Sequence, residues 1–301
     1  MEKLLKWSIS ANSQDEESKK RAGQPDPELL AQLFGGPDEP TLMNESMKVI
    51  NNPETDLENK EVAFDNFEML IENMDNANNI ENMKLWPPLL QNLDSEHISL
   101  RRYACSCIGT AVQNNPKCQE HFLKHSDGIK KLISISSNLE EDDSVKLKAL
   151  YALSNVLRHN KPAYEEFSSQ GGWDEISPLL TSLDNSNEKI KLRTLSLLSS
   201  IITNGLSEEV IEHLHNNKVV ISMLRVLKAE GHIASIDKVL SLLTTLVQNK
   251  FIFSDEEVSL IRQSLTTIAE LEDRLNNDDL TTINTFVKVE HIKQLKRSKK
   301  Q

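Results

Sequence analysis

Four stretches decide the fold: "RRYACSCIGTAVQN" (residues 101–114), "KLKALYALSNVLRH" (146–159), "KLRTLSLLSSIITN" (191–204) and "IDKVLSLLTTLVQN" (236–249). Each begins 45 residues after the one before it, and a weaker fifth copy, "KEVAFDNFEMLIEN" (60–73), begins 41 residues before the first. A period of about 40 to 47 residues with helical content is typical of armadillo and HEAT arrays. The sequence therefore predicts a repeat protein.

Apolar residues recur at helical spacing within each strong copy. One such helix cannot bury its apolar stripe alone, so neighbouring copies are expected to stack into a continuous core. The four stripes are Cys105, Ile108, Ala111 and Val112; Leu150, Leu153, Val156 and Leu157; Leu195, Leu198, Ile201 and Ile202; and Leu240, Leu243, Leu246 and Val247. Shorter amphipathic pieces between them, such as "GIKKLISIS" and "GGWDEISPLLTSL", are expected to form the second helix of each repeat, with Gly128 and Gly171 in helix-terminating turns.

Composition supports an all-α protein. The 301 residues include only 9 Gly and 10 Pro, whereas a compact β-rich enzyme needs more turns. We expect an armadillo-like α-solenoid of about four to five repeats over residues 57–285. Capping helices are expected over residues 21–56, a flexible N-terminal segment over 1–20 and a basic tail over 286–301.

Charge and cysteine content restrict the possible ligands and the cellular compartment of the protein. A net charge of −12 disfavours nucleic-acid binding, which needs a basic surface. Three cysteines without framework spacing suggest a reducing, cytoplasmic compartment, and the basic "KRSKK" near the C-terminus leaves room for a nuclear fraction. "MEKLLKWSIS" lacks a secretory cleavage pattern, and no apolar run is long enough for a membrane span. We expect a monomer.

The long helices carry a second, polar stripe. The repeat period aligns Lys148, Arg193 and Lys238 as a basic column, and Tyr151, about one turn after Lys148, is expected to belong to the same partner-binding surface. Recurrence in register favours a surface for an acidic partner over ordinary solvated helix surface. The neighbouring column reads Thr110, Asn155, Ser200 and Thr245. This column lacks the Asn ladder with which armadillo peptide carriers hold a peptide backbone, so recognition of a folded surface is favoured.

No sequence motif indicates catalysis. Walker, GxSxG, Rossmann and HExxH patterns are missing, so we expect neither an enzyme nor a cofactor. Cys118, His121 and His125 do lie on one helical face and resemble three ligands of a zinc site. A fourth ligand or an open catalytic position would still be needed, and no acidic partner is evident, so surface and half-buried histidines at the edge of a repeat are the favoured interpretation. Metal analysis separates the two interpretations.

Several blocks closely resemble one family. "MEKLLKWSI", "RAGQPDPELLAQLFGGPDEPTLMNESM", "VAFDNFEMLIENMDNANNIENMKLW" and "IGTAVQNNPKCQEHF" are similar to the fungal Fes-type nucleotide exchange factors and their animal counterpart, the heat-shock-protein-binding protein. The resemblance covers nearly the whole chain and implies an armadillo-fold regulator of a cytosolic heat shock protein 70 chaperone. Such a protein binds the chaperone's nucleotide-binding domain, strains the nucleotide cleft, releases ADP and so promotes client release. An armadillo adaptor that binds a folded acidic partner without affecting nucleotide is the alternative.

The resemblance also implies site residues. "DNANN" is expected to form a joint between two helices at one end of the binding surface. Its Ala77 leaves room for close approach, and its polar side chains contact the partner: Asp75, Asn78 and Asn79. The positions matching Ala77 and Arg193 belong to the family's chaperone-contacting face. Helix capping by the Asn residues is the structural alternative.

The N-terminal cluster is a second implied site. In the family this segment is thought to mimic a client peptide in the chaperone's substrate-binding domain, and "LLKWSI" resembles such a peptide. The residues concerned are Leu4, Leu5, Trp7 and Ile9. A cap packed on the first repeat is the alternative interpretation.

Overall fold

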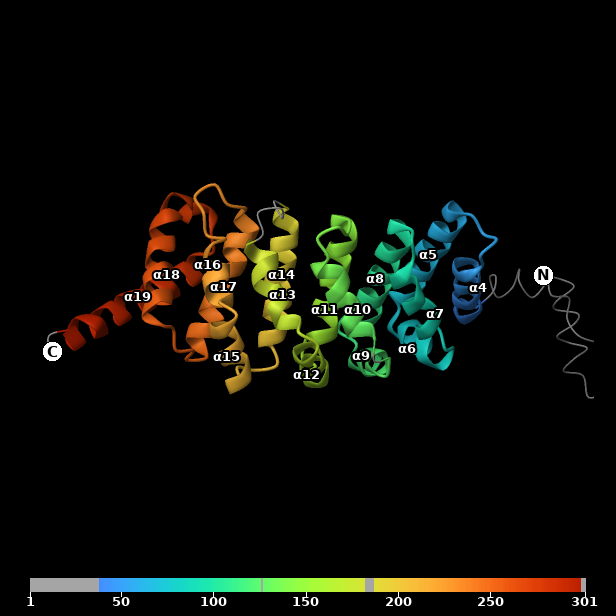
Figure 1. Ribbon diagram of the computed structural model, residues 1–301, viewed down its shortest axis with the longest axis horizontal. Coiled ribbons are helices and arrows are strands. Elements are labelled where there is room, and N and C mark those ends of the chain that lie inside the picture. The colour runs from blue at the N-terminus through green and yellow to red at the C-terminus, as the bar shows by residue number, and fades with distance from the viewer. Residues whose placement is uncertain (1–37, 126, 182–186, 299–301) are drawn as a thin grey trace, which may run out of the picture.

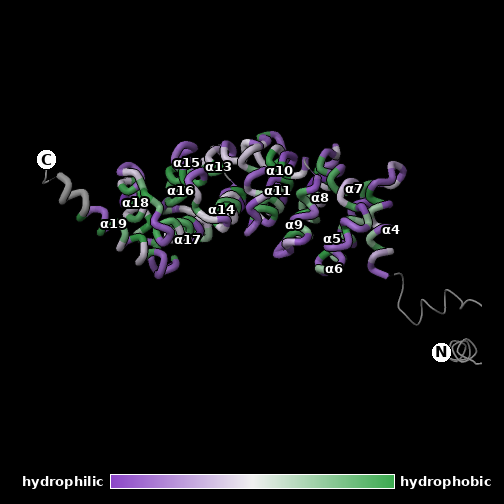
Figure 2. The backbone as a smooth tube through the Cα atoms, turned by 90° about the horizontal axis from the view of Figure 1, so that it is seen from below, coloured by the Kyte–Doolittle hydropathy of each residue, from purple (hydrophilic) through white to green (hydrophobic). Residues whose placement is uncertain are grey.

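The computed structural model describes residues 38–125, 127–181 and 187–298, with side chains described up to residue 292. Helices follow one another along a single elongated array, from α4 near the N-terminal end to α19 at the C-terminal end (Figure 1). Apolar and polar residues are interspersed along the described part of the array (Figure 2). The predicted armadillo-like α-solenoid is confirmed for the described residues. The predicted N-terminal segment, residues 1–20, lies outside them.

The quoted repeats form the third helix of each repeat. These helices are α5 (Leu57–Ile71), α8 (Ile98–Val112), α11 (Asp143–Leu157), α14 (Glu188–Ile202) and α17 (Ile233–Gln248). Each contacts the next, so that the five make one continuous layer. The predicted stripes are buried in the core at every position except Val247, which is partly buried. This burial supplies the main stabilisation of the array.

Two shorter helices precede each of the third helices α8, α11, α14 and α17. The second helices are α7 (Trp86–Gln91), α10 (Gly128–Ser137), α13 (Gly172–Thr181) and α16 (Val219–Leu224), as predicted, with the 3-10 turn η1 (Asn92–Asp94) after α7. The first helices, which the sequence did not reveal, are α6 (Met74–Asn82), α9 (Pro116–Leu123), α12 (Lys161–Ser169) and α15 (Glu208–Asn216). The ends of the array hold α4 (Glu39–Asn51), α18 (Asp255–Thr267), η2 (Ala269–Arg274) and α19 (Asn277–Ser298).

Asparagine and proline set the start of two of the first helices, α9 and α12. Asn115 caps α9 by accepting a hydrogen bond from the Cys118 amide at 3.2 Å, and Pro116 occupies the first helical position. Asn114 just before has a φ of 51°, a left-handed conformation that ends α8. Asn160 and Pro162 repeat the arrangement at α12.

Two predictions about boundaries need correction. Gly171 has a φ of +80°, as expected for a helix-terminating turn, but Gly128 is the first residue of α10. A Cβ on Gly128 would lie 2.6 Å from the Phe122 ring, so space rather than backbone conformation requires glycine there. The predicted tail boundary at residue 286 falls inside α19, where Val287 is only 7% exposed.

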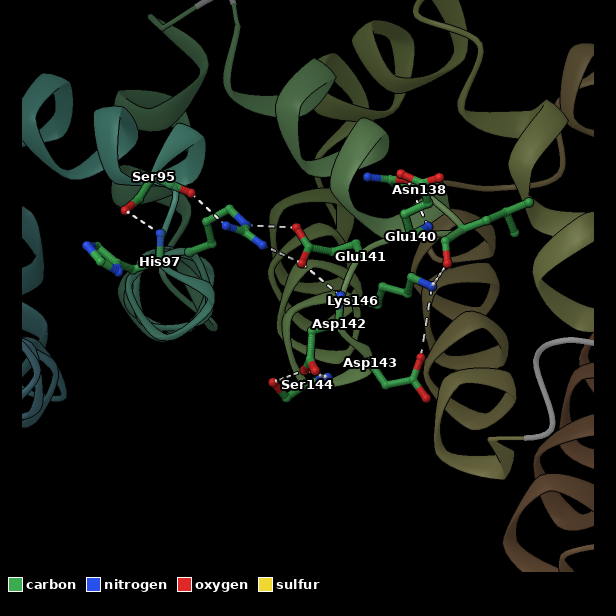
Figure 3. A network of polar contacts seen from close by, with 11 residues as sticks. Ser95, His97, Asn138, Glu140, Glu141, Asp142, Asp143, Ser144 and Lys146 are labelled. Carbon is green, nitrogen blue, oxygen red and sulfur yellow. Dashed lines mark hydrogen bonds and ion pairs between the residues drawn. The ribbon is translucent and has the colours of Figure 1, made fainter. Parts of the chain in front are cut away.

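A part-buried ion pair between Arg101 and Glu141 links neighbouring repeats at one edge. Arg101 Nε and Nη2 donate to the two Glu141 carboxylate oxygens at 2.8 and 2.7 Å, and Nη1 donates to the Ser95 carbonyl at 2.6 Å. Figure 3 shows Glu141 in this network, beside Lys146 and Asp143. Because a fork of two parallel bonds fixes orientation, the pair holds the start of α8 against the turn that precedes α11.

Candidate partner-binding surface

The predicted basic column lies on the layer of third helices. Lys148 Nζ of α11 donates to Ser106 Oγ of α8 at 2.9 Å, and it lies 5.7 Å from the ring centroid of Tyr151. The Arg193 guanidinium of α14 lies 5.4 Å from the same ring. The structure thus brings Lys148, Tyr151 and Arg193 together, although 42 residues separate Tyr151 from Arg193 in the sequence.

These cations have no carboxylate partner within 4.0 Å among the described residues. Nearby cations on the same two helices differ: Lys191 lies 2.8 Å from Glu188, and Lys146 lies 3.9 Å from Asp143. Arg193 is exposed, whereas Lys148 is half-buried. Unpaired positive charge on adjacent helices can bind carboxylates of another molecule.

Lys238 extends the basic column to α17, and its ammonium is partly buried. Its Nζ donates to Ser199 Oγ at 3.1 Å. Burial lowers the pKa of the Lys238 ammonium, and the positive charge of Arg158 lowers this pKa further. A carboxylate close to Lys238 would favour its ammonium form and so oppose both of these shifts.

The same face turns acidic and apolar at α5. Glu68 accepts hydrogen bonds from Ser106 Oγ and from Thr110 Oγ1, the latter at 3.1 Å. Val62 and Met69 of α5 are 53% and 65% exposed. They occupy the columns of Lys148 and Asn155 in the weaker fifth copy, and aligning that copy residue by residue would have revealed them.

The column next to the cations faces the neighbouring helix. Asn155 is 8% exposed, and its Nδ2 donates to the Gly109 carbonyl at 3.2 Å. Ser200 is fully buried and donates to the Ser196 carbonyl. Asn155 therefore ties α11 to α8 instead of reaching toward a bound peptide.

The predicted joint at residues 75–79 is wrong, because these residues belong to helix α6. Asn73 caps this helix by accepting from the Asp75 amide at 2.9 Å. Asn76 is buried, and its Nδ2 donates to Glu39 Oε2 at 2.7 Å and to the Leu70 carbonyl at 2.9 Å. Asparagine therefore starts α6 and fixes it against α4 and α5.

The predicted close approach of a partner to the Ala77 side chain is also corrected. Ala77 is only 2% exposed, and its carbonyl accepts a hydrogen bond from Cys118 Sγ of α9 at 3.4 Å. Asp75 is exposed, while Asn78 and Asn79 are half-buried. Asn79 Oδ1 accepts from Asn82 Nδ2 at 3.2 Å. A partner-binding role for these polar residues stays a prediction.

Two of the three residues of the suggested zinc site make other contacts, Cys118 with the Ala77 carbonyl and His125 with Glu81. Burial, with a smaller contribution from Glu81, raises the pKa of the Cys118 thiol to about 12, and this thiol donates to the Ala77 carbonyl at 3.4 Å. His125 Nε2 lies 3.8 Å from Glu81 Oε2. Within the described ranges, no group of three or more His, Cys, Asp or Glu side chains could hold a metal ion.

Two further predictions concern the ends of the chain and the membrane. The client-mimic residues, Leu4, Leu5, Trp7 and Ile9, lie outside the described residues. Among the helices that the structure does describe, none is both long and apolar enough to cross a bilayer.

Fold comparison defines the class as an armadillo repeat protein. A designed armadillo repeat protein superimposes with a TM-score of 0.65 at 12% identity, covering 83% of this chain and 99% of its own. A second designed armadillo protein, solved with the peptide (KR)4, also gives a TM-score of 0.65 at 12% identity, with coverages of 82% and 97%. Likeness at this identity concerns the fold alone.

Sequence comparison then identifies the family. The profile described as nucleotide exchange factor Fes1 matches residues 1–80, and that of the SIL1/FES1/HPBP1 C-terminal domain matches residues 76–226. The chain belongs to this Fes1-type family of nucleotide exchange factors. The Hsp70 nucleotide exchange factor FES1 of Scheffersomyces stipitis is 50% identical over 288 residues, covering 95% of this chain and 100% of that protein. The FES1 of Saccharomyces cerevisiae is 47% identical, with coverages of 94% and 99%.

Proposed function

We propose that this protein is a co-chaperone that binds the nucleotide-binding domain of a cytosolic Hsp70, accelerates release of ADP and thereby promotes client release. The observation that carries the proposal is similarity to Hsp70 nucleotide exchange factors over the full length of the relatives. This function requires no catalytic group. It needs a surface whose affinity differs between the nucleotide-bound and nucleotide-free chaperone.

The layer of third helices supplies a candidate for that surface. Lys148, Arg193 and Lys238 present positive charge without carboxylate partners among the described residues. An acidic patch on the chaperone would pair with this column, and the polar residues of α6, Asp75, Asn78 and Asn79, would contact the chaperone nearer the N-terminal end of the array. Buried stripes couple the repeats, so the array can act as one stiff body against a deformable nucleotide cleft.

Two terminal segments extend the proposal. Residues 1–20 act as a client mimic in the substrate-binding domain, where a tethered apolar peptide competes at an effective concentration that can approach millimolar. The protein acts in the cytoplasm as a monomer, and its basic C-terminal residues allow a nuclear fraction.

The experiment is a stopped-flow measurement of labelled ADP leaving a cytosolic Hsp70 after mixing with excess unlabelled ATP. Addition of this protein should raise the release rate in a saturable manner. An unchanged rate together with clear binding would favour an armadillo adaptor instead. No binding and no rate change would overturn the proposal.

A further inference from the structure

Gly109 lies in the middle of α8, where glycine weakens a helix and neither a turn nor a cap requires it. A Cβ at this position would lie 2.5 Å from both Cδ1 and Cε1 of Tyr151, and 3.2 Å from the Ala152 Cα. The ring of Tyr151 therefore occupies the space that any larger residue at position 109 would fill. Glycine at this position is explained by the neighbouring aromatic ring on α11.

The repeat register strengthens this pairing. The positions equivalent to Gly109 in the other copies are Glu68, Ser154, Ser199 and Thr244. The positions equivalent to Tyr151 are Asp65, Ser106, Ser196 and Ser241. Glycine thus occurs once in its column, directly opposite the one aromatic residue of the facing column. One repeat earlier the equivalent residues also touch, because Ser106 donates a hydrogen bond to Glu68.

The hydroxyl end of Tyr151 is held by the same helix. Tyr151 Oη donates to Gln113 Oε1 at 2.9 Å, and Gln113 follows Gly109 by four residues, one turn further along the chain. Gly109 receives the edge of the ring and Gln113 the hydroxyl. The ring therefore has a defined position relative to α8 as well as to its own helix.

Two cationic side chains lie against the Tyr151 ring. Arg193 lies 5.4 Å and Lys148 lies 5.7 Å from the ring centroid, both within the range of a cation–π interaction. The negative potential of the ring attracts both cations, although they repel each other. Long charged side chains lose conformational entropy when they bind, and ordering them beforehand reduces that loss.

We propose that Tyr151, seated on Gly109, is a positioning residue that orders Lys148 and Arg193 before carboxylates of the partner bind them. The link to affinity rests on the proposed function, whereas the ordering itself is a property of the free protein. The two parts are therefore tested separately.

The first test uses the free protein. Relaxation of the Arg193 side-chain Nε in labelled protein should report an ordered guanidinium, and Tyr151→Leu should make it mobile on the nanosecond scale. Tyr151→Phe keeps the ring and should keep most of the order. Tyr103→Leu is the matched control. Tyr103 on α8 stacks with Phe64, and its ring contacts the Arg102 guanidinium and not Arg193. Equal mobility of Arg193 in the wild type and Tyr151→Leu would overturn the proposal, whether or not the protein is an exchange factor.

The second test measures coupling in binding to full-length Hsp70. Tyr151→Leu should weaken binding about tenfold in the wild-type background. The same change should have little effect where Lys148 and Arg193 are both Ala, because a positioning residue acts through the residues that it orders. An equal loss in both backgrounds would mean that Tyr151 contacts the partner directly, which contradicts positioning. If wild-type protein does not bind Hsp70 at all, the proposed function fails while the relaxation test still decides the ordering.

Gly109→Ala tests separately whether Gly109 is needed to position the Tyr151 ring. The added methyl should displace the ring, mobilise Arg193 and lower the melting temperature. Combining Gly109→Ala with Tyr151→Leu should recover most of the melting temperature, because the collision with the ring is gone and only the 3.2 Å approach to the Ala152 Cα remains, but it should not restore the order of Arg193. If the Arg193 side chain is as ordered in folded Gly109→Ala protein as in the wild type, Gly109 is not needed to position the ring.

Discussion

Reversing the charge of Arg193 separates binding from stability. Arg193 is exposed on α14, and its one specific contact among the described residues is with the Tyr151 ring at 5.4 Å. Arg193→Glu therefore removes a cation–π contact and places a carboxylate in the basic column. The apolar stripe of α14 is untouched, because Leu195 and Leu198 face the core.

The structure predicts a small loss of stability and a much larger loss of binding affinity for Arg193→Glu. An exposed cation–π contact contributes about 0.5–1 kcal/mol, and Arg and Glu have similar helix propensities, so the free energy of unfolding should change by about 1 kcal/mol or less. Truncating one member of a buried, hydrogen-bonded interfacial charge pair costs about 2–5 kcal/mol of binding free energy, and we expect Arg193 to form such a pair in the complex. At about 1.4 kcal/mol per tenfold, affinity for Hsp70 should fall by about thirtyfold or more.

The assay pairs urea unfolding with ADP release from Hsp70 at a fixed, subsaturating protein concentration. Arg225→Glu is the matched control, since Arg225 is exposed at the end of α16 and the reversal changes net charge equally. Arg193→Glu should lose exchange activity at nearly normal stability, and Arg225→Glu should keep both. Normal ADP release with Arg193→Glu would refute the assignment of the third-helix layer as the binding face.

Three further predictions follow from burial and position. Ala77→Arg should lower the free energy of unfolding by several kcal/mol, because a charge enters the core, and binding to Hsp70 should fall in parallel. As the control, Asn78→Ala should leave urea unfolding nearly unchanged. Arg101→Met should destabilise by about 1–3 kcal/mol, because the part-buried Glu141 carboxylate loses its cation and keeps only the hydrogen bond from the Asp142 amide, and changing Glu141 to Leu as well should recover most of the loss in urea. Deleting residues 1–20 should preserve the melting temperature and ADP release but slow displacement of a labelled client; parallel loss of stability and exchange would favour the capping interpretation.

The sequence revealed the third helices because burial repeats there at a fixed period. Each third helix packs against two others, so its apolar stripe is wide and recurs in register. The first helices were missed because they are short and bury little: α15 buries only Val210 and Leu214 among its nine residues. Their signal lay in the caps, such as Asn115 followed by Pro116.

The candidate site was partly predictable for a similar reason. Register alone aligned Lys148, Arg193 and Lys238, but it could not distinguish Arg193 from Lys191, whose ammonium is paired with Glu188. The Asn-rich stretch was misread because its contacts are long-range. Asn76 is held by Glu39, 37 residues away, and Ala77 is covered by α9. Local helix propensity contains no information about such partners.

The central claim predicts a reciprocal effect of nucleotide on binding. If this protein weakens ADP binding by some factor, ADP must weaken the protein's binding to Hsp70 by the same factor. Titration calorimetry of this protein into full-length Hsp70, with and without saturating ADP, measures that factor directly. We predict clearly tighter binding to nucleotide-free Hsp70, by a ratio equal to the loss in ADP affinity measured in the reverse titration. Equal affinity in both states would contradict nucleotide exchange as the function of this protein.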